Sequence, residues 1–229
     1  MILKVASRKA SGTAAKAAPK AGPPKAETKG SPWPSARQRT VEREAKREAV
    51  LHAAAQAFSE KGFHSTSLDD IAVRLGVTKP TLYYYVKSKD EILEAVISRA
   101  LHDILAFNPS ESEQSALDQL LALLRRYAEV VANDFGRSLV RMLDGELSER
   151  RRRGIRAARE EINRRIEQLL KRGVAEGSIA PCNVKMTSFM LAGAVNWIGR
   201  WYDDDGELEP QEIGAIFADQ LARGLLPRP

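Results

Sequence analysis

A short polar segment carries the side chains of this chain that are best suited to chemistry. Positions 78 to 84 bring together hydroxyl groups, a cation and phenols: Thr78, Lys79, Thr81, Tyr83 and Tyr84. Such groups donate hydrogen bonds to phosphate oxygens and to base edges in a DNA groove. Three consecutive tyrosines, 83 to 85, are hard to bury together in one short helix, so we expect at least one to be exposed. The alternative is a compact helical hairpin whose tyrosines belong to the core.

The residues before this segment predict the elements that position it. Ser67 and Asp70 have the spacing of an N-terminal capping pair, and Gly76 stands where a helix commonly ends in a left-handed residue. Thr78 is expected to cap a second short helix, with Pro80 tolerated in its first turn. Two helices joined by a glycine-containing turn predict a helix-turn-helix whose second helix is the reading element.

A further helix is expected to follow, from about residue 89 to 107. Ser88 and Glu91 form another potential capping box at its start. Lys89 falls in its first turn, where free N–H groups and the helix dipole favour an anion such as a DNA phosphate. A solvated surface lysine is the plainer alternative. Thr66, just before the first helix of the motif, is likewise expected to offer its hydroxyl to phosphate.

About 45 residues, from Ala49 to Leu93, resemble the DNA-binding domain of the tetracycline-repressor (TetR) family. The motifs that carry this resemblance are Ala57-Phe58, Gly62-Phe63, Thr66, Asp70-Ile71-Ala72, Gly76-Val77, Leu82-Tyr83 and Lys89-Asp90-Glu91-Ile92-Leu93. One departure is Val86, where relatives usually carry an aromatic residue. The resemblance implies a phosphate contact for Lys89. The expected DNA-binding residues are Arg37, Arg39, Thr66, Ser67, Thr78, Lys79, Pro80, Thr81, Tyr83, Tyr84 and Lys89.

The positive charge of the chain lies at its N-terminal side. The formal net charge is +6, yet residues 1–47 hold twelve Lys or Arg and only three acids. The remainder is therefore slightly acidic, and the basic excess is typical of a nucleic-acid footprint. Residues 1–36 lack apolar periodicity and are expected to be disordered. We favour a solubilising tail, although a basic arm that follows the DNA backbone is the functional alternative, with Arg37 and Arg39 as its best candidates.

Composition limits the compartment and the class of the protein. The single cysteine, Cys182, excludes an internal disulfide framework and fits a reducing compartment. No apolar run approaches a membrane span, and the N-terminus lacks the apolar stretch of a secretory signal. An organelle transit peptide is disfavoured because the family resembled is bacterial. We expect a cytoplasmic protein that needs no cofactor or metal and does not contact a membrane.

Beyond residue 89 the sequence predicts only helices. Their expected spans are 115–133, 135–146, 148–176, 183–202 and 211–224, and no alternating strand pattern appears. The whole chain is therefore predicted to be all-α. By resemblance, residues 37–88 form the helix-turn-helix domain and residues 89–229 form a ligand-binding and dimerisation domain.

The helix at 183–202 mixes large aromatic residues with glycine and alanine. Small residues let a partner helix approach and tryptophans supply anchoring area, so this helix and the last one can build a symmetric four-helix dimer interface. Residues 194–202 resemble a branch of the family that regulates fatty-acid and sterol breakdown and senses acyl-CoA thioesters. The expected ligand-binding residues are Phe135, Leu139, Met142, Trp197, Arg200 and Trp201. A purely structural role for the tryptophans is the alternative.

An arginine run in the helix at 148–176 also has two interpretations. Residues 150–153 are all arginine, and Arg156 and Arg159 follow. We favour a solvated face, because four acids, Glu146, Glu149, Glu160 and Glu161, are near enough in sequence to pair with the run. The sharper alternative is an anchor for the phosphates of a large anionic ligand.

These patterns favour a homodimeric, ligand-responsive repressor that binds a palindromic DNA operator and is released by a small hydrophobic molecule, with an acyl-CoA as one candidate. An enzyme is the first rival, but the sequence shows no zinc-ligand spacing, no phosphate-binding glycine loop and no catalytic Ser, Cys or His constellation. The second rival is a helical interaction adaptor that retains a helix-turn-helix without using it.

Overall fold

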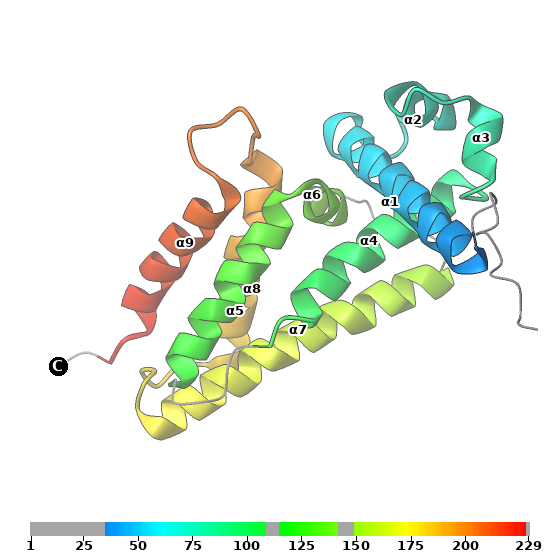
Figure 1. Ribbon diagram of the computed structural model, residues 1–229. Helices are drawn as coiled ribbons and strands as arrows, with labels where there is room; N and C mark the ends of the chain where they lie inside the picture. The colour runs from blue at the N-terminus through cyan, green and yellow to red at the C-terminus, as the bar shows by residue number, and fades with distance from the viewer. Residues whose placement is uncertain (1–34, 109–114, 142–148, 228–229) are drawn as a thin grey trace, which may run out of the picture.

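The computed structural model describes residues 35–108, 115–141 and 149–227, apart from the side chains of residues 150 and 151. Over this part of the chain the fold is entirely helical, which confirms the predicted all-α class. The helices are α1 (Ala36–Lys61), α2 (Leu68–Arg74), α3 (Lys79–Tyr83), α4 (Lys89–Leu105), α5 (Ala116–Ala132), α6 (Asp134–Arg141), α7 (Glu149–Glu176), α8 (Val184–Trp201) and α9 (Pro210–Leu225). Figure 1 shows α1, α2 and α3 at one end of the molecule and α5, α8 and α9 at the other.

Helix α1 starts at Ala36, the last residue of the segment expected to be disordered. Its N-cap is Ser35, whose hydroxyl accepts a hydrogen bond from the Gln38 N–H at 3.2 Å, while the Gln38 amide oxygen accepts from the Ser35 N–H at 2.7 Å. This reciprocal capping box satisfies two donors that the first turn would otherwise expose. Ala36 is therefore helical, whereas the expected tail included it. The helix ends at Gly62, whose φ of 82° suits a residue without a Cβ.

Local signals account for the start of α2 and the turn after it. The Ser67 hydroxyl accepts from the Asp70 N–H at 3.1 Å, and an Asp70 carboxylate oxygen accepts from the Ser67 N–H at 2.8 Å. Gly76 has a φ of 65°, as expected for the residue that lets the chain turn into α3. Thr78 occupies the N-cap position of α3, but the prediction that its hydroxyl caps the helix is wrong. That hydroxyl bonds the hydroxyl of Thr81 at 2.9 Å instead.

Helix α4 leads from the helix-turn-helix into the second domain. The Ser88 hydroxyl accepts from the Glu91 N–H at 3.1 Å, as a cap should. The reciprocal bond differs from the prediction, because the Glu91 carboxylate accepts from the Lys87 N–H at 2.9 Å and not from Ser88. The helix ends at Leu105, two residues before the expected end, and packs against α1, α6 and α7.

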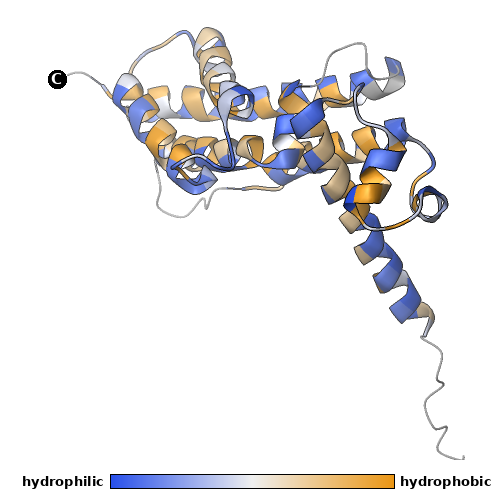
Figure 2. Cartoon of the chain, turned by 90° about the horizontal axis from the view of Figure 1, so that it is seen from above, coloured by the Kyte–Doolittle hydropathy of each residue, from blue (hydrophilic) through white to orange (hydrophobic). Residues whose placement is uncertain are grey.

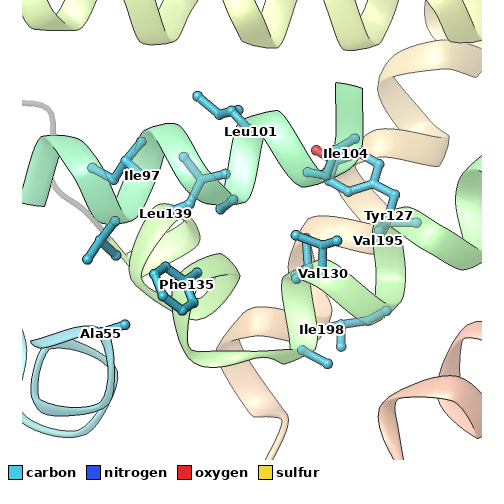
Figure 3. Packing of buried hydrophobic residues seen from close by; sticks show 14 of the residues in the cluster. Ala55, Ile97, Leu101, Ile104, Tyr127, Val130, Phe135, Leu139, Val195 and Ile198 are labelled. Atoms are coloured by element: carbon cyan, nitrogen blue, oxygen red, sulfur yellow. The ribbon is translucent and has the colours of Figure 1, made fainter. Parts of the chain in front are cut away.

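The second domain is organised around α5. This helix contacts α9, α8, α7 and α6, and the long helix α7 runs beneath both α4 and α5 (Figure 1). The buried cluster joins all of these helices, as Figure 3 shows for Ile97 and Leu101 of α4, Val130 of α5, Leu139 of α6 and Val195 of α8. Within the described residues, no helix is both long and apolar enough to cross a membrane.

A polar cluster fastens the two domains together. Arg137 is buried, and its Nη2 atom donates to carboxylate oxygens of Asp134 and Asp204, each at 2.5 Å. Asp134 also accepts from the hydroxyl of Ser59 in α1 at 2.9 Å. Arg141 donates to the Ser59 carbonyl oxygen as well. The cluster therefore links α1, α6 and the loop between α8 and α9.

Candidate DNA interface and ligand cavity

Helix α3 presents its polar side chains outward from a small apolar anchor. Leu82 of α3 and Val86 just after it are buried in the hydrophobic core, and α3 packs against α2. Thr78, Lys79 and Pro80 are exposed, and Thr81 is half-buried. Tyr83 and Tyr84 are 52% and 77% exposed, whereas Tyr85 packs partly against the core. The first two phenols therefore face solvent, which does not fit the alternative of a tyrosine core.

Lys79 is held against the preceding helix. Its ammonium donates to a carboxylate oxygen of Asp69 in α2 at 2.7 Å, and both groups are exposed. The hydrogen bond to Asp69 and the charge of that carboxylate raise the pKa of the Lys79 ammonium. Lys79 stays cationic at neutral pH, so an anion that binds its ammonium must displace the Asp69 carboxylate or share the ammonium with it.

Thr66 does not offer a free hydroxyl. The residue is buried, and its hydroxyl lies 2.8 Å from the carbonyl oxygen of Gly62 and 3.2 Å from that of Ala57. Gly62 is the C-cap of α1, and its carbonyl oxygen lies where the helix no longer supplies an N–H partner. The expectation that the hydroxyl donates to phosphate is wrong, because its single proton is used inside the chain.

Lys89 also has internal partners. Its ammonium donates to the carbonyl oxygens of Phe63 and Thr66, both at 2.9 Å, and lies 4.2 Å from the centre of the Phe63 ring. An ammonium has three N–H donors, so one remains available to phosphate. Ser67 is exposed, but its hydroxyl is engaged with Asp70, and Arg37 and Arg39 lie exposed on the first turns of α1.

A cavity of about 430 Å³ lies in the second domain between α4, α5, α6, α7 and α8. Three of the six expected ligand residues line it, namely Leu139, Trp197 and Arg200. The lining residues that were not expected are Leu101, Tyr127, Val140, Arg159, Gly193 and Asn196. Its size falls in the usual range for small-molecule sites.

The cavity combines apolar walls with one internal polar pair and two arginines. The Tyr127 hydroxyl donates to the side-chain oxygen of Asn196 at 2.9 Å. Burial raises the pKa of the Tyr127 phenol, with the Asn196 hydrogen bond and the charge of Arg159 acting in the opposite direction. Arg159 and Arg200 line the cavity from α7 and α8 and are both exposed. The arrangement suits a ligand with an apolar part and an anionic group.

The other expected ligand residues lie elsewhere. Phe135 is buried in the core and packs edge-on against the His52 ring, with ring centres 4.8 Å apart. Trp201 is 46% exposed and stacks on Phe217 of α9, with ring centres 6.3 Å apart. Neither residue is among those that line the cavity. Met142 lies outside the described residues.

Helices α8 and α9 both carry exposed apolar side chains, which we call the apolar face of α8 and α9. Its members are Met186, Phe189, Met190, Trp197, Trp201 and Ile216, each between 46% and 64% exposed. Gly193 lies on the same helix, and a Cβ built there would meet no atom within 4 Å. Contiguous apolar surface rimmed by polar residues commonly marks a protein interface.

The arginine run of α7 contributes one cavity residue. Arg159 lines the cavity and donates to the Leu139 carbonyl oxygen at 3.3 Å, while Arg153 and Arg156 are exposed. Arg152 forms an ion pair with Glu149 at 2.7 Å, as expected if the run lies on a solvated helix face. Among the described side chains, no group of three or more His, Cys, Asp or Glu could hold a metal ion.

Two family models match the chain, one over each domain. Residues 50–96 match the model described as bacterial regulatory proteins, tetR family, and residues 113–225 match the tetracyclin repressor-like C-terminal domain. The first covers α2, α3 and the packed part of α1, and the second covers the domain that contains the cavity.

Individual relatives agree with these models. A TetR/AcrR-family transcriptional regulator from Thermobifida fusca is 32% identical, with a TM-score of 0.56 over 79% of this chain and 98% of that one. The HTH-type transcriptional repressor KstR2 of Mycolicibacterium smegmatis is 24% identical over 77% of this chain and 88% of KstR2. AibR, solved with isovaleryl coenzyme A and operator DNA, is 23% identical, with a TM-score of 0.65 over 80% of this chain and 98% of AibR.

Proposed function

The chain belongs to the TetR family of bacterial regulatory proteins, and from that premise we propose that it is a homodimeric repressor released from its operator by an anionic, partly apolar ligand. The observation that carries the proposal is the combination of an outward-facing α3 with a separate cavity whose walls include α4 and α6. Helix α3 is suited to reading DNA. A ligand in the cavity contacts α4 and α6, and so can change the position of α3 relative to the second domain.

The reading surface is the exposed face of α3. Thr78, Lys79, Pro80 and Thr81 approach the backbone and base edges, and Tyr83 and Tyr84 supply phenolic donors. In a dimer, the two reading helices enter successive major grooves about 34–36 Å apart, which requires a palindromic operator. Arg37 and Arg39 extend the positive surface at the start of α1.

The apolar face of α8 and α9 supplies the dimer interface. Pairing α8 and α9 with their symmetry copies forms a four-helix contact that covers Met190, Trp201 and Ile216. Because Trp197 lies on this face and also lines the cavity, the ligand site lies close to the dimer seam.

An acyl-CoA fits the chemistry of the cavity. Leu101, Leu139 and Val140 suit an apolar acyl group, and Arg159 and Arg200 suit phosphate or carboxylate oxygens. That AibR was solved with isovaleryl coenzyme A supports this ligand class.

The ligand must bind two conformers unequally to release DNA. Leu101 belongs to α4, the helix that follows α3 in the chain, and Leu139 belongs to α6, which packs on α1. A ligand that displaces α6 also acts on the cluster of Arg137, Asp134 and Ser59. Repacking there changes the spacing of the two reading helices.

The test couples DNA binding to the ligand. Operator sequences are first selected from random duplexes, and their affinity is then measured by fluorescence anisotropy with increasing acyl-CoA of several chain lengths. We expect an acyl-CoA to weaken operator binding by about 5–150-fold, the usual range of allosteric coupling. Tyr84→Ala is expected to lose operator affinity with the dimer intact.

The variant Arg200→Gln is expected to require more acyl-CoA for release, whereas Arg223→Gln, an exposed arginine of α9, serves as the matched control. Selection that yields no palindrome would contradict the reading role of α3. Operator affinity unchanged at saturating acyl-CoA would reject that ligand class.

A further inference from the structure

The first three turns of α1 extend beyond the packed body of the protein. Residues 36–46 are all exposed, and burial begins only at Val50, apart from two half-buried positions. Figure 2 shows the start of this helix as a mostly hydrophilic rod that projects away from the other helices. A helical segment without a packed apolar face gains little stability from the fold. Its order depends on the Ser35 and Gln38 capping box, and its surface is available to a partner.

One side of this rod carries a row of arginines. Arg39, Arg43 and Arg47 are spaced four residues apart, so they lie on one helical face at steps of about 6 Å. All three line a groove of about 730 Å³ between α1 and the segment from Tyr83 to Glu91. Among the described residues, neither Arg43 nor Arg47 forms an ion pair.

The opposite wall of the groove comes from the end of α3 and the turn into α4. It includes the exposed phenols of Tyr83 and Tyr84 and the side chain of Lys87. Four cations therefore line the groove with two carboxylates, Glu44 and Glu91. Glu91 is already engaged by the Lys87 N–H, so the free hydrogen-bonding groups of the groove are mostly donors.

We propose that this groove binds the sugar–phosphate backbone of one DNA strand beside the base pairs read by α3, with Arg43 and Arg47 as phosphate contacts. The proposal rests on the DNA-binding function above and assigns a second contact surface to it. The arginine row spans about 12 Å, which corresponds to the axial rise of three to four nucleotides of one strand. Guanidinium groups and phenols are common donors to phosphate oxygens. Since phosphates carry no base identity, the groove supplies affinity and register without sequence preference.

The test is the salt dependence of DNA binding by the full chain. We compare wild type with the double variant Arg43→Gln and Arg47→Gln, since arginine and glutamine have similar helix propensities. Each protein is titrated with a selected operator duplex and a random duplex of equal length at several salt concentrations. The slope of log affinity against log salt is expected to fall by about 0.9 for each phosphate that the variant no longer neutralises, hence by about 2 per protomer. The ratio of the two affinities should stay unchanged.

Two matched variants separate this groove from a general charge effect. Arg164→Gln with Arg223→Gln removes the same charge from exposed positions of α7 and α9 and should keep the wild-type slope. Replacing Arg43 and Arg47 with lysine should restore most of the slope, because the charge returns. Circular dichroism checks that the helix content is kept.

The outcomes distinguish the proposed phosphate-binding groove from the proposed operator-binding function. If the glutamine double variant keeps the wild-type salt slope, the proposal that the groove binds phosphates is wrong, whatever operator the selection finds. An altered ratio between operator and random duplex would also overturn it, because base readout would then be involved. If wild type binds both duplexes equally while the double variant still has a smaller slope, the groove binds phosphates as proposed. The proposed operator-specific function is then wrong.

Discussion

Gly136 occupies a position in α6 where no side chain fits. A Cβ built on it would lie 1.9 Å from the carbonyl oxygen of Val130 and 2.6 Å from the Cα of Val131. These atoms belong to the backbone of α5, so they cannot move aside as a side chain would. The Gly136 N–H also donates to the Asn133 side-chain oxygen at 2.9 Å, which closes the tight connection between α5 and α6.

We therefore expect Gly136→Ala to lower the free energy of unfolding by roughly 1–3 kcal/mol or more, the usual cost of overpacking. Urea denaturation followed by circular dichroism measures this change. Gly154→Ala is the matched control, because a Cβ there meets nothing within 4 Å inside the helix α7. It should stabilise the protein by about 0.5–1 kcal/mol through helix propensity. Equal effects of the two variants would contradict the steric argument.

At the scale of elements, α2 depends on hydrogen bonds at its first turn. The Asp70 carboxylate accepts from both the hydroxyl and the N–H of Ser67, and α2 is only seven residues long. Hydrogen bonds from the Ser67 hydroxyl and backbone hold the pKa of Asp70 below its ordinary value, with Lys61 adding to the effect. The ionised carboxylate is thus the form that supports the helix.

The sign of the pH dependence follows from that lowered pKa. The contribution of Asp70 to stability is present above its unfolded pKa, near 3.8, and is lost as the pH falls through the lower folded pKa. The free energy of unfolding of wild type should therefore exceed that of Asp70→Asn by a smaller amount as the pH falls below about 4. Urea titrations of both proteins between about pH 2 and pH 7 measure this difference. A difference that does not change with pH would contradict the assigned role of the carboxylate.

At the scale of the whole molecule, the unpaired apolar face of α8 and α9 predicts the assembly. Met190 and Ile216 are 59% and 47% exposed, and neither lines the cavity. A carboxylate at either position would be desolvated in a dimer without a partner, which is costly.

We expect Met190→Glu and Ile216→Glu each to shift the protein from dimer toward monomer. Light scattering after size-exclusion chromatography measures the mass that checks this. Val41→Glu is the matched control, since Val41 is 58% exposed but lies on α1, far along the chain from this face. The monomeric variants should also lose operator affinity, because one half-site then binds alone. Variants that keep the wild-type mass would place the interface elsewhere.

Local sequence signals were enough to predict the helix-turn-helix and the polar, exposed face of α3. Capping residues such as Ser67, the turn glycine Gly76 and the polar face of α3 act through neighbours within a few positions, so their meaning does not depend on the rest of the fold. The N-terminal charge excess was equally visible. The expected tail, residues 1–36, overlaps the start of α1, because Ser35 and Gln38 form a capping box that begins the helix at Ala36.

Which polar groups are already hydrogen-bonded and which residues meet in one cavity depends on how distant helices pack. The Thr66 hydroxyl bonds carbonyl groups at the end of α1. The Lys89 ammonium donates to two carbonyl oxygens, those of Phe63 and Thr66, in the segment between α1 and α2. Tyr127 and Asn196, 69 positions apart, meet in the cavity, whereas Trp201 stacks on α9 outside it. Residue type shows which bonds a side chain can make, but its actual partners depend on how distant helices pack.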